Sequence, residues 1–331
     1  MALFKNVDEI KLLLPVIGTT KFASMLVFIN QAERDYIIPN ISQAQYDNLS
    51  AAYNVTTPSL SAAQTKLLAK CQAALAQYFF YLWIPTAQLS IGDNGIRIAT
   101  TDTLKTAFEW QIDGLQRSTL KAAGSAMDDL LAYMEVHKTD YALWAASNSY
   151  TEFKECFIPS TSLFTILFTP LGGSRLNFIA IRSAMLKVQE FIIQSELGDA
   201  FYAQLKAGHI ANNASTADKK IIVMVQKALA PLTMFRAITE LSVSIDERGI
   251  LNFDNTNSRT LNTKLPAKDQ MLFKLEKSCE ADGKAYVQKM KEFLKTNIVD
   301  YPTYANSSAY DGDTADESFK TKDTDTLFNF G

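Results

Sequence analysis

QAALAQYFFYLWIPTAQLSIGDNGI, residues 72–96, occurs a second time in the chain as QKALAPLTMFRAITELSVSIDERGI, residues 226–250. Aligned without a gap, the two stretches agree at nine of 25 positions. Each pattern predicts the end of an apolar helix, a break, and a short alternating strand that turns at a glycine. The chain is therefore organised around two copies of one unit.

The similarity extends beyond these stretches at an offset of about 155 residues, which indicates a duplicated domain. Residues 41–54, ISQAQYDNLSAAYN, align with residues 197–208, LGDAFYAQLKAG, and each has an aromatic residue three positions before a leucine. Two copies are too few for a solenoid, and 331 residues suffice for two domains. We predict similar domains at residues 1–150 and 151–299.

Helical periodicity accounts for most of each predicted domain. In the first domain the spacing of apolar residues and the breakers predict helices at residues 19–32, 42–54, 61–84 and 102–138. Pro39 and Pro85 are expected to end the first and third of these, and Ser42 and Ser61 to start the second and third. In the second domain the predicted helices are residues 176–194, 196–206, 217–238 and 266–296. Residues 141–167 are predicted to be irregular.

A small β-hairpin is predicted in each domain, because alternating apolar residues flank a turn sequence. The expected turns are formed by two sets of three residues: Asp93, Asn94 and Gly95, and Glu247, Arg248 and Gly249. The predicted fold is thus mainly α, with two tandem similar helical domains that each carry one small β-hairpin.

The residues before the first hairpin are expected to form a core. Residues 78–83 are apolar on nearly every side of the predicted helix, which is typical of a central helix. Arg236 replaces Leu82 in the second copy, so that face is expected to be wetter or paired with an acid.

Composition and motifs argue against catalysis. The net charge is −3 and the pI is about 5.6, so no overall basic field favours nucleic-acid binding. The three cysteines are widely spaced and predict reduced structural thiols, and His137 and His209 are expected at the surface near helix ends. We therefore expect no catalytic, cofactor-binding or metal site and no enzyme activity. Residues 1–18 are expected to be neither a signal peptide nor a membrane span.

Residues 300–331 differ in composition and are predicted to form an acidic, extended C-terminal tail. They hold seven acids against two lysines and show no apolar period. Near its end stand Leu327, Phe328 and Phe330. They are either exposed residues without a role or a protein-interaction anchor that folds onto a partner, and both interpretations stay open.

The order of these elements resembles an uncharacterised family encoded among the virion genes of tailed phages and prophages, and it is similar to the helical head-to-tail connector (adaptor) proteins. The resemblance rests on four segments: residues 61–98 preceded by 45–49, and 216–253 preceded by 201–205. Connector proteins usually carry one such domain, so the tandem duplication is a departure.

The resemblance implies a structural virion protein of the phage neck, made in the host cytoplasm. It implies a homo-oligomeric ring of 12 copies between portal and tail, with portal and tail or neck proteins as partners and no cofactor or membrane. It leaves open a passing contact with genomic DNA in the channel. The alternative is an intracellular enzyme or regulatory module that acts on a small molecule or nucleic acid. Ring particles in negative stain would favour the connector, and a monomer with a deep polar pocket would favour the alternative.

Overall fold

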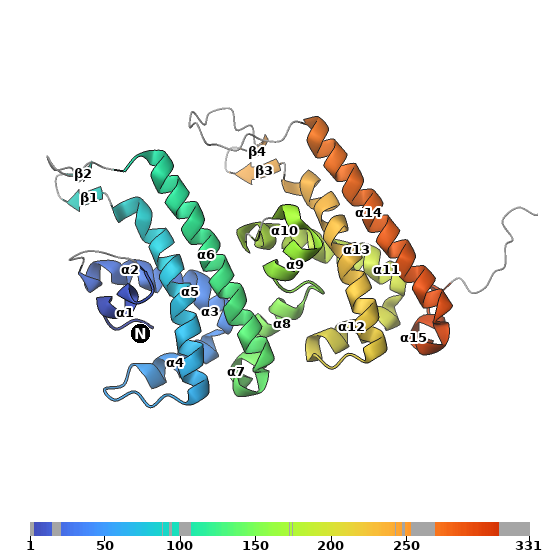
Figure 1. Cartoon of the computed structure of the whole chain (residues 1–331), viewed down its shortest axis with the longest axis horizontal. Helices are drawn as coiled ribbons and strands as arrows, with labels where there is room; N and C mark the ends of the chain where they lie inside the picture. Colours follow the sequence, from blue (N-terminus) through green and yellow to red (C-terminus); the bar gives the residue numbers. More distant parts are fainter. Residues whose placement is uncertain are drawn as a thin grey trace, which may run out of the picture.

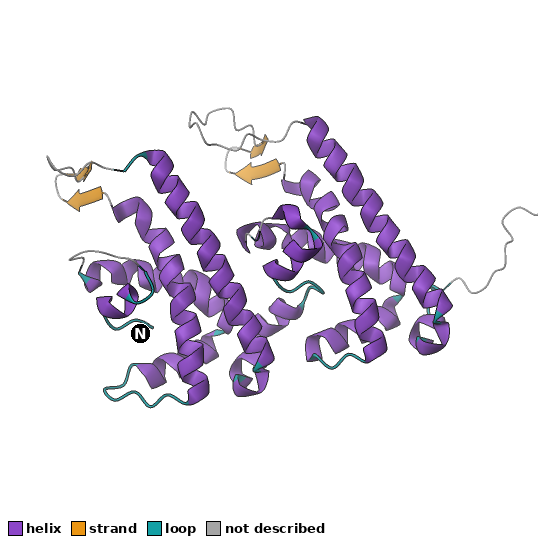
Figure 2. Cartoon of the chain, in the orientation of Figure 1, coloured by secondary structure: helices purple, strands orange, loops and turns teal. Residues whose placement is uncertain are grey.

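A computed structural model gives the fold. It describes residues 3–14, 21–87, 89–92, 95–98, 107–171, 173, 175–241, 243–246, 249–252 and 269–310. These residues are predominantly helical (Figure 2), which confirms the predicted mainly α class.

The first repeat runs from α1 to α8. Its elements are α1 (Val7–Lys11), α2 (Phe22–Ala32), the π-helical turn η1 (Glu33–Ile37), α3 (Ile38–Ile41), α4 (Gln43–Tyr53), α5 (Ala62–Ala87), β1 (Leu89–Gly92), β2 (Gly95–Ile98), α6 (Glu109–Val136), the 3₁₀ turn η2 (Lys138–Asp140), α7 (Ala142–Ala145) and α8 (Asn148–Lys154).

The second repeat has the same succession of elements from α10 to α15 as the first has from α2 to α7. Its elements are α9 (Thr161–Leu167), the 3₁₀ turn η3 (Thr169–Leu171), α10 (Arg175–Val188), the π-helical turn η4 (Gln189–Ile193), α11 (Gln194–Leu197), α12 (Asp199–Ala211), α13 (Thr216–Leu241), β3 (Val243–Asp246), β4 (Gly249–Asn252), α14 (Asp269–Thr296), the 3₁₀ turn η5 (Ile298–Asp300) and α15 (Pro302–Ala305). The predicted internal duplication is confirmed.

The two repeats stand side by side with the same orientation (Figure 1). In each, the two longest helices pack along one another, α5 with α6 and α13 with α14. Both pairs run in the same direction, and both pairs of strands lie at the same end of the molecule. Like ends of the repeats therefore point the same way.

Proline does not end the first helix, contrary to the prediction. The helical path from α2 continues through η1 into α3, and Pro39 lies in the first turn of α3, where its missing N–H is tolerated. The path ends at Ser42 with φ 71°, and its counterpart in the second repeat ends at Gly198 with φ 75°. The two repeats thus share an unusual backbone turn even though Ser42 is not a glycine.

Helices α5 and α13 start as predicted but end later, whereas α6 starts only at Glu109 rather than near residue 102. Ser61 and Gln64 cap α5 reciprocally, each side chain accepting a hydrogen bond from the other's backbone N–H at 3.0–3.1 Å. In the second repeat the Ser215 hydroxyl accepts from the Asp218 N–H. Pro85, expected to end the helix, lies within the last turn of α5. Gly114 and Gly124 do not interrupt α6, which is one continuous helix.

Each repeat has one pair of four-residue antiparallel strands. Gly95 pairs with Gly92 in the first, and Gly249 pairs with Asp246 in the second. Four of the predicted turn residues, Asp93, Asn94, Glu247 and Arg248, lie outside the described residues, so the predicted turns stay predictions.

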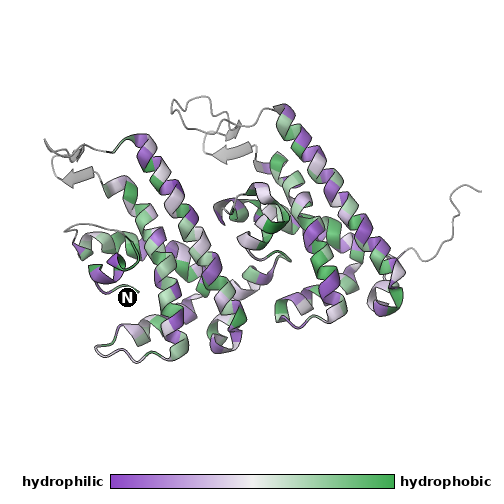
Figure 3. Cartoon of the chain, in the orientation of Figure 1, coloured by the Kyte–Doolittle hydropathy of each residue, from purple (hydrophilic) through white to green (hydrophobic). Residues whose placement is uncertain are grey.

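Each repeat has its own hydrophobic core. Tyr78 and Phe79 are buried in the first core, whereas residues 80–83 of the predicted cluster are only partly buried. The colouring of Figure 3 alternates along α6 and α14, which pack on α5 and α13, respectively. Helix α6 also contacts α10 of the second repeat. By length and composition α13 alone among the described helices could cross a membrane, and it packs against α10 and α14 in the second core.

Two predictions about irregular segments are wrong. Residues 141–167 form short helices, and Tyr141 and Trp144 from this segment are buried in the first core. Residues 301–310, assigned to the tail from sequence, belong to the second core, where Tyr301 and Tyr304 are buried. These aromatic residues occupy equivalent positions after the helix pair of each repeat. Their segments are too short to show a hydrophobic periodicity, so the sequence did not predict them as part of the core.

Candidate functional site: the joint between the repeats

The surface where the two repeats meet joins segments from most of the chain. Helices α3, α6 and α8 of the first repeat contact α10 and α12 of the second, or pack around that contact. We call this surface the joint.

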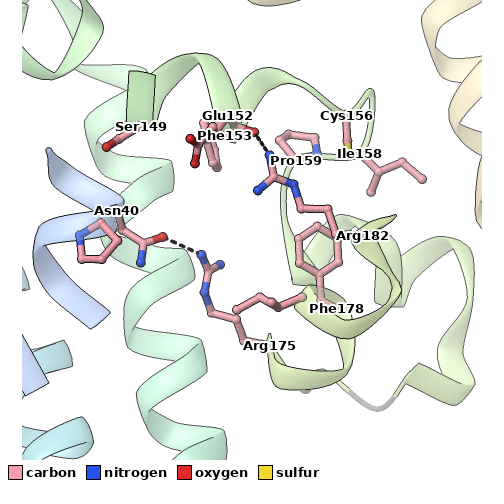
Figure 4. Close-up of a pocket in the computed structure, with 12 residues that line it drawn as sticks. Asn40, Ser149, Glu152, Phe153, Cys156, Ile158, Pro159, Arg175, Phe178 and Arg182 are labelled. Carbon is pink, nitrogen blue, oxygen red and sulfur yellow. Dashed lines mark hydrogen bonds between the residues drawn. The ribbon is translucent and has the colours of Figure 1, made fainter. Parts of the chain in front are cut away.

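Arg175, the first residue of α10, is the main polar link across the joint (Figure 4). Its Nη1 lies 2.5 Å from Asp128 Oδ1 on α6, and its Nη2 donates to Asn40 Oδ1 on α3 at 2.9 Å. The side chains of Arg175 and Asp128 are only 10% and 9% exposed. A buried charge that is paired in this way is costly to leave without its partner, so this contact fixes how the repeats sit.

Gly124 lets α10 approach α6 closely. A Cβ built at this position would lie 2.8 Å from Arg175 Cβ, closer than such atoms normally come. The glycine therefore admits the start of α10 next to α6, and it does so at the helix turn just before Asp128.

Two further contacts fasten the C-terminal end of α12 to the first repeat. The Tyr150 hydroxyl donates to the Ile210 carbonyl at 2.8 Å, and Lys138 Nζ donates to the Ala211 carbonyl at 3.4 Å. Free carbonyls at a helix end are satisfied by such donors, and a lysine also complements the helix dipole. The joint is thus tied at two separated places.

The chain segment that links the repeats is itself anchored. Arg182 on α10 donates to the Glu152 carbonyl and, at 2.9 Å, to Glu155 Oε2, and Lys154 pairs with Glu135 at 3.0 Å. The cleft lined by Glu152, Arg175 and Arg182 has a volume of only about 70 Å³, below the range of roughly 300–1,000 Å³ of small-molecule sites. Its geometry suits a structural contact better than a metabolite site.

Comparison with known proteins finds one family. Residues 35–154 and, again, residues 193–314 match the model of a family described as "Family of unknown function (DUF6712)". The chain belongs to DUF6712. No curated protein and no solved structure matches it.

The two repeats share a buried hydrogen-bond network that sequence reasoning missed. In the first, Glu33 accepts from the Leu3 N–H at 2.5 Å and from the Tyr46 hydroxyl at 2.9 Å. Burial raises the pKa of the Glu33 carboxyl above its ordinary value. The same place in η4 of the second repeat is taken by Gln189.

Gln189 makes the same contacts without a charge. Its Oε1 accepts from the Phe157 N–H at 2.9 Å, and its Nε2 donates to the Tyr202 hydroxyl at 3.0 Å. A glutamine of the long helix also takes part in each repeat. Gln72 Nε2 donates to the Leu3 carbonyl and Gln226 Nε2 donates to the Phe157 carbonyl, both at 2.8 Å. The signal in the sequence was the alignment of Gln72 with Gln226, whose partners are too distant in the chain to be foreseen.

The outward face of the second DUF6712 repeat lacks the joint's key residues. The places of Gly124, Asp128 and Asn40 are taken there by, respectively, Lys284, Gln288 and Glu196. Glu196 forms an ion pair with Lys291 at 2.8 Å, which joins α11 to α14 within the repeat. The joint therefore occurs once within the described chain.

Two of the titratable groups considered from the sequence lie at the joint: Cys156 lines the cleft beside Arg182, and His209 Nε2 lies 3.1 Å from the Cys156 carbonyl oxygen. His137 lies near Asp140 at 3.9 Å, and both are well exposed. His209 is partly buried rather than at the surface, and burial lowers its pKa to about 4. The three cysteines are buried and unpaired. Among the described residues no group of three His, Cys, Asp or Glu could hold a metal ion.

The proposed interaction anchor, Leu327, Phe328 and Phe330, lies outside the described residues and stays a prediction. Arg236, expected to be wet or paired, is paired with Glu240 at 2.8 Å, and Lys187 binds the same carboxylate. That prediction is confirmed.

Proposed function

We propose that this DUF6712 chain is a structural protein of a tailed-phage neck, a head-to-tail connector that assembles into a ring between portal and tail. The resemblance of residues 61–98 and 216–253 to connector proteins motivates the proposal. Its setting would be the virion, with portal and neck or tail proteins as partners and DNA passing through the channel.

The observation that carries the proposal is the like orientation of the two repeats (Figure 1). A two-fold pair would use the same surface on both repeats. Here α3 and α6 of one repeat meet α10 of the other, which is a head-to-tail contact. Head-to-tail contacts generate rings when the rotation closes, so the pair within one chain has the relation of two neighbours in a ring.

The joint supports the proposal through its rigidity. Its ion pair is buried, and it is fastened a second time through Tyr150 and Lys138. A ring wall must hold its subunits in fixed relation, and each chain would contribute two such units already joined. Contacts between chains would use other residues, because the outward face of the second repeat differs from that of the first.

The test is the state of the purified full-length chain. We expect ring particles in negative-stain electron microscopy, with a mass in mass photometry that is a multiple of 36.8 kDa, twelve-fold for the expected copy number. Because each chain has two repeats, the rings should show twice as many lobes as chains. A chain that stays monomeric at micromolar concentration, alone and with its portal protein, would overturn the proposal.

A further inference from the structure

A groove on the second repeat has the size and chemistry of a peptide site. Helix α13 contributes Lys227 and Pro231 to its lining, and α14 contributes Tyr286 and Lys289. The end of α9, with Ile166, completes it. We call this the α13/α14 groove; its volume is about 580 Å³, within the range of ligand sites.

The groove combines exposed apolar surface with positive charge. Ile166 is 78% exposed and Tyr286 is 39% exposed. Neither Lys227 nor Lys289 takes part in any ion pair found among the described residues, and Asp282 is the one acid among the residues that line the groove. An acidic segment with aromatic side chains would complement both properties.

The first repeat does not share this chemistry. The counterparts of Lys227, Pro231, Tyr286 and Lys289 are, in that order, Ala73, Gln77, Ala126 and Asp129. Asp129 is an acid where the groove has a lysine, and it is paired with Lys70 at 2.5 Å. The cationic apolar groove is therefore particular to the repeat that is followed by residues 311–331.

Those residues have the complementary composition. Residues 311–331 contain six acids against Lys320 and Lys322. Their large apolar side chains are Phe319 and, near the end, Leu327, Phe328 and Phe330. Asp323 and Asp325 lie close before the last three, so charge and apolar surface come together as they do in the groove.

The groove lies within reach of its own chain. Tyr310 packs on Tyr304 beside the end of α14, with ring centroids 5.8 Å apart. Along the axis of α14, Lys289 and Asp282 lie about 10 and 21 Å before Thr296. A flexible segment as long as residues 311–326 has a root-mean-square span of about 20–24 Å. This span is comparable with those distances along α14, so the apolar residues can reach the groove at an effective concentration in the millimolar range.

We propose that residues 319–330 dock in the α13/α14 groove of the same chain, with the aromatic side chains against Ile166 and Tyr286 and the carboxylates of Asp323 and Asp325 near Lys227 and Lys289. From sequence, a neighbouring subunit or another virion protein was the expected partner of this segment. The comparable span favours the chain's own groove, and this docking does not depend on ring formation.

The test is site-specific photo-crosslinking in the full-length chain. A benzophenone amino acid replaces Phe328, and equal amounts of isotopically light and heavy chains are mixed before irradiation. We expect crosslinks to α9 and α14 near Ile166 and Tyr286 that pair light with light and heavy with heavy. Light–heavy pairs at the frequency of random mixing, or crosslinks only outside the groove, would overturn the proposal.

Charge-reversal variants provide the matched controls. K227E combined with K289E should lower the crosslink yield about tenfold, a change of roughly 1.4 kcal/mol in docking free energy. K220E combined with K274E, at exposed lysines of the same two helices that do not line the groove, should leave the yield unchanged. D323K combined with D325K should restore the yield in the K227E/K289E chain. Equal losses from both lysine pairs, or no rescue, would contradict specific docking.

Discussion

Glu33 and Gln189 occupy equivalent positions in the two repeats, and the hydrogen bonds around them differ mainly in charge. Both side chains accept from a backbone N–H, and both contact a tyrosine hydroxyl. Because the folded protein raises the pKa of Glu33, it favours the protonated carboxyl. Stability from this group is present below its unfolded pKa of about 4.5 and is lost as pH rises through the folded pKa.

The first prediction follows from that sign. Glu33→Gln should reproduce the arrangement of Gln189 and remove a buried charge, so the free energy of unfolding at pH 7 should rise by about 1 kcal/mol. The gain should vanish below about pH 4.5, where Glu33 is protonated in both states. Urea unfolding followed from pH 4 to pH 8 measures it.

The reciprocal change is the control. Gln189→Glu should destabilise the second repeat at pH 7, because the amide that donates to the Glu155 carbonyl and to Tyr202 would be lost. A Glu33→Gln chain that is less stable than the wild type at pH 7 would show that the ionised carboxylate is the better partner for Leu3 and Tyr46.

The core prediction concerns Phe79. This ring is fully buried, whereas Phe80, its neighbour in the predicted apolar cluster at residues 78–83, is only partly buried. Phe79→Ala should therefore lower the free energy of unfolding by about 3–5 kcal/mol, and Phe80→Ala by clearly less. Thermal unfolding of both variants measures the difference, and equal losses would contradict the assigned burial.

At the scale of elements, the packing of α6 against α10 depends on Gly124. Alanine is normally better than glycine inside a helix by about 0.5–1 kcal/mol, so a Gly→Ala change in α6 should stabilise unless space is lacking. At Gly124 the added methyl would lie 2.8 Å from Arg175 Cβ. Gly124→Ala should therefore lower the midpoint of thermal unfolding and loosen the contact of Arg175 with Asp128.

Gly114 is the matched control within the same helix. A Cβ there would meet nothing within 4 Å, so Gly114→Ala should stabilise the chain. Hydrogen exchange at the start of α10 should rise in Gly124→Ala and stay unchanged in Gly114→Ala. Stabilisation by both changes would refute the close approach of α10 to α6.

The sequence predicted the elements in which the periodic spacing of apolar residues extends over many residues. The four longest helices and the serine starts of α4 and α5 follow from local spacing and capping chemistry. The predictions that Pro39 and Pro85 end helices were wrong. Pro39 lies in the first turn of α3, where a proline is tolerated, and Pro85 lies in the last turn of α5, where a proline removes little hydrogen bonding. The short helices that close each core carry too few residues to show a period.

The joint could not be predicted in the same way. Arg175 meets Asn40 across 135 residues and Asp128 across 47. No local pattern links these residues, and only the packed repeats bring them together. The local sequence does not explain Gly124 within a predicted helix, because the close approach that requires a glycine comes from another repeat.

At the scale of the whole molecule, the two repeats lie side by side with like ends pointing the same way (Figure 1). The first repeat offers Asn40, Gly124 and Asp128 to the second. The second repeat offers different side chains on its own outward face. The chain therefore has direction, from the repeat that receives α10 to the repeat that supplies it.

The outward face of the second repeat differs from the face of the first repeat that contacts α10, and this difference limits open-ended polymerisation through the contact of the joint. A protein whose far side fits its near side can add copies without end and grow into fibres. Lys284 places a long charged side chain where Gly124 leaves room, and Gln288 lacks the charge with which Asp128 holds an arginine. The contact that joins the two halves of a chain therefore cannot form in the same way between chains, and assembly of chains has to use a different surface.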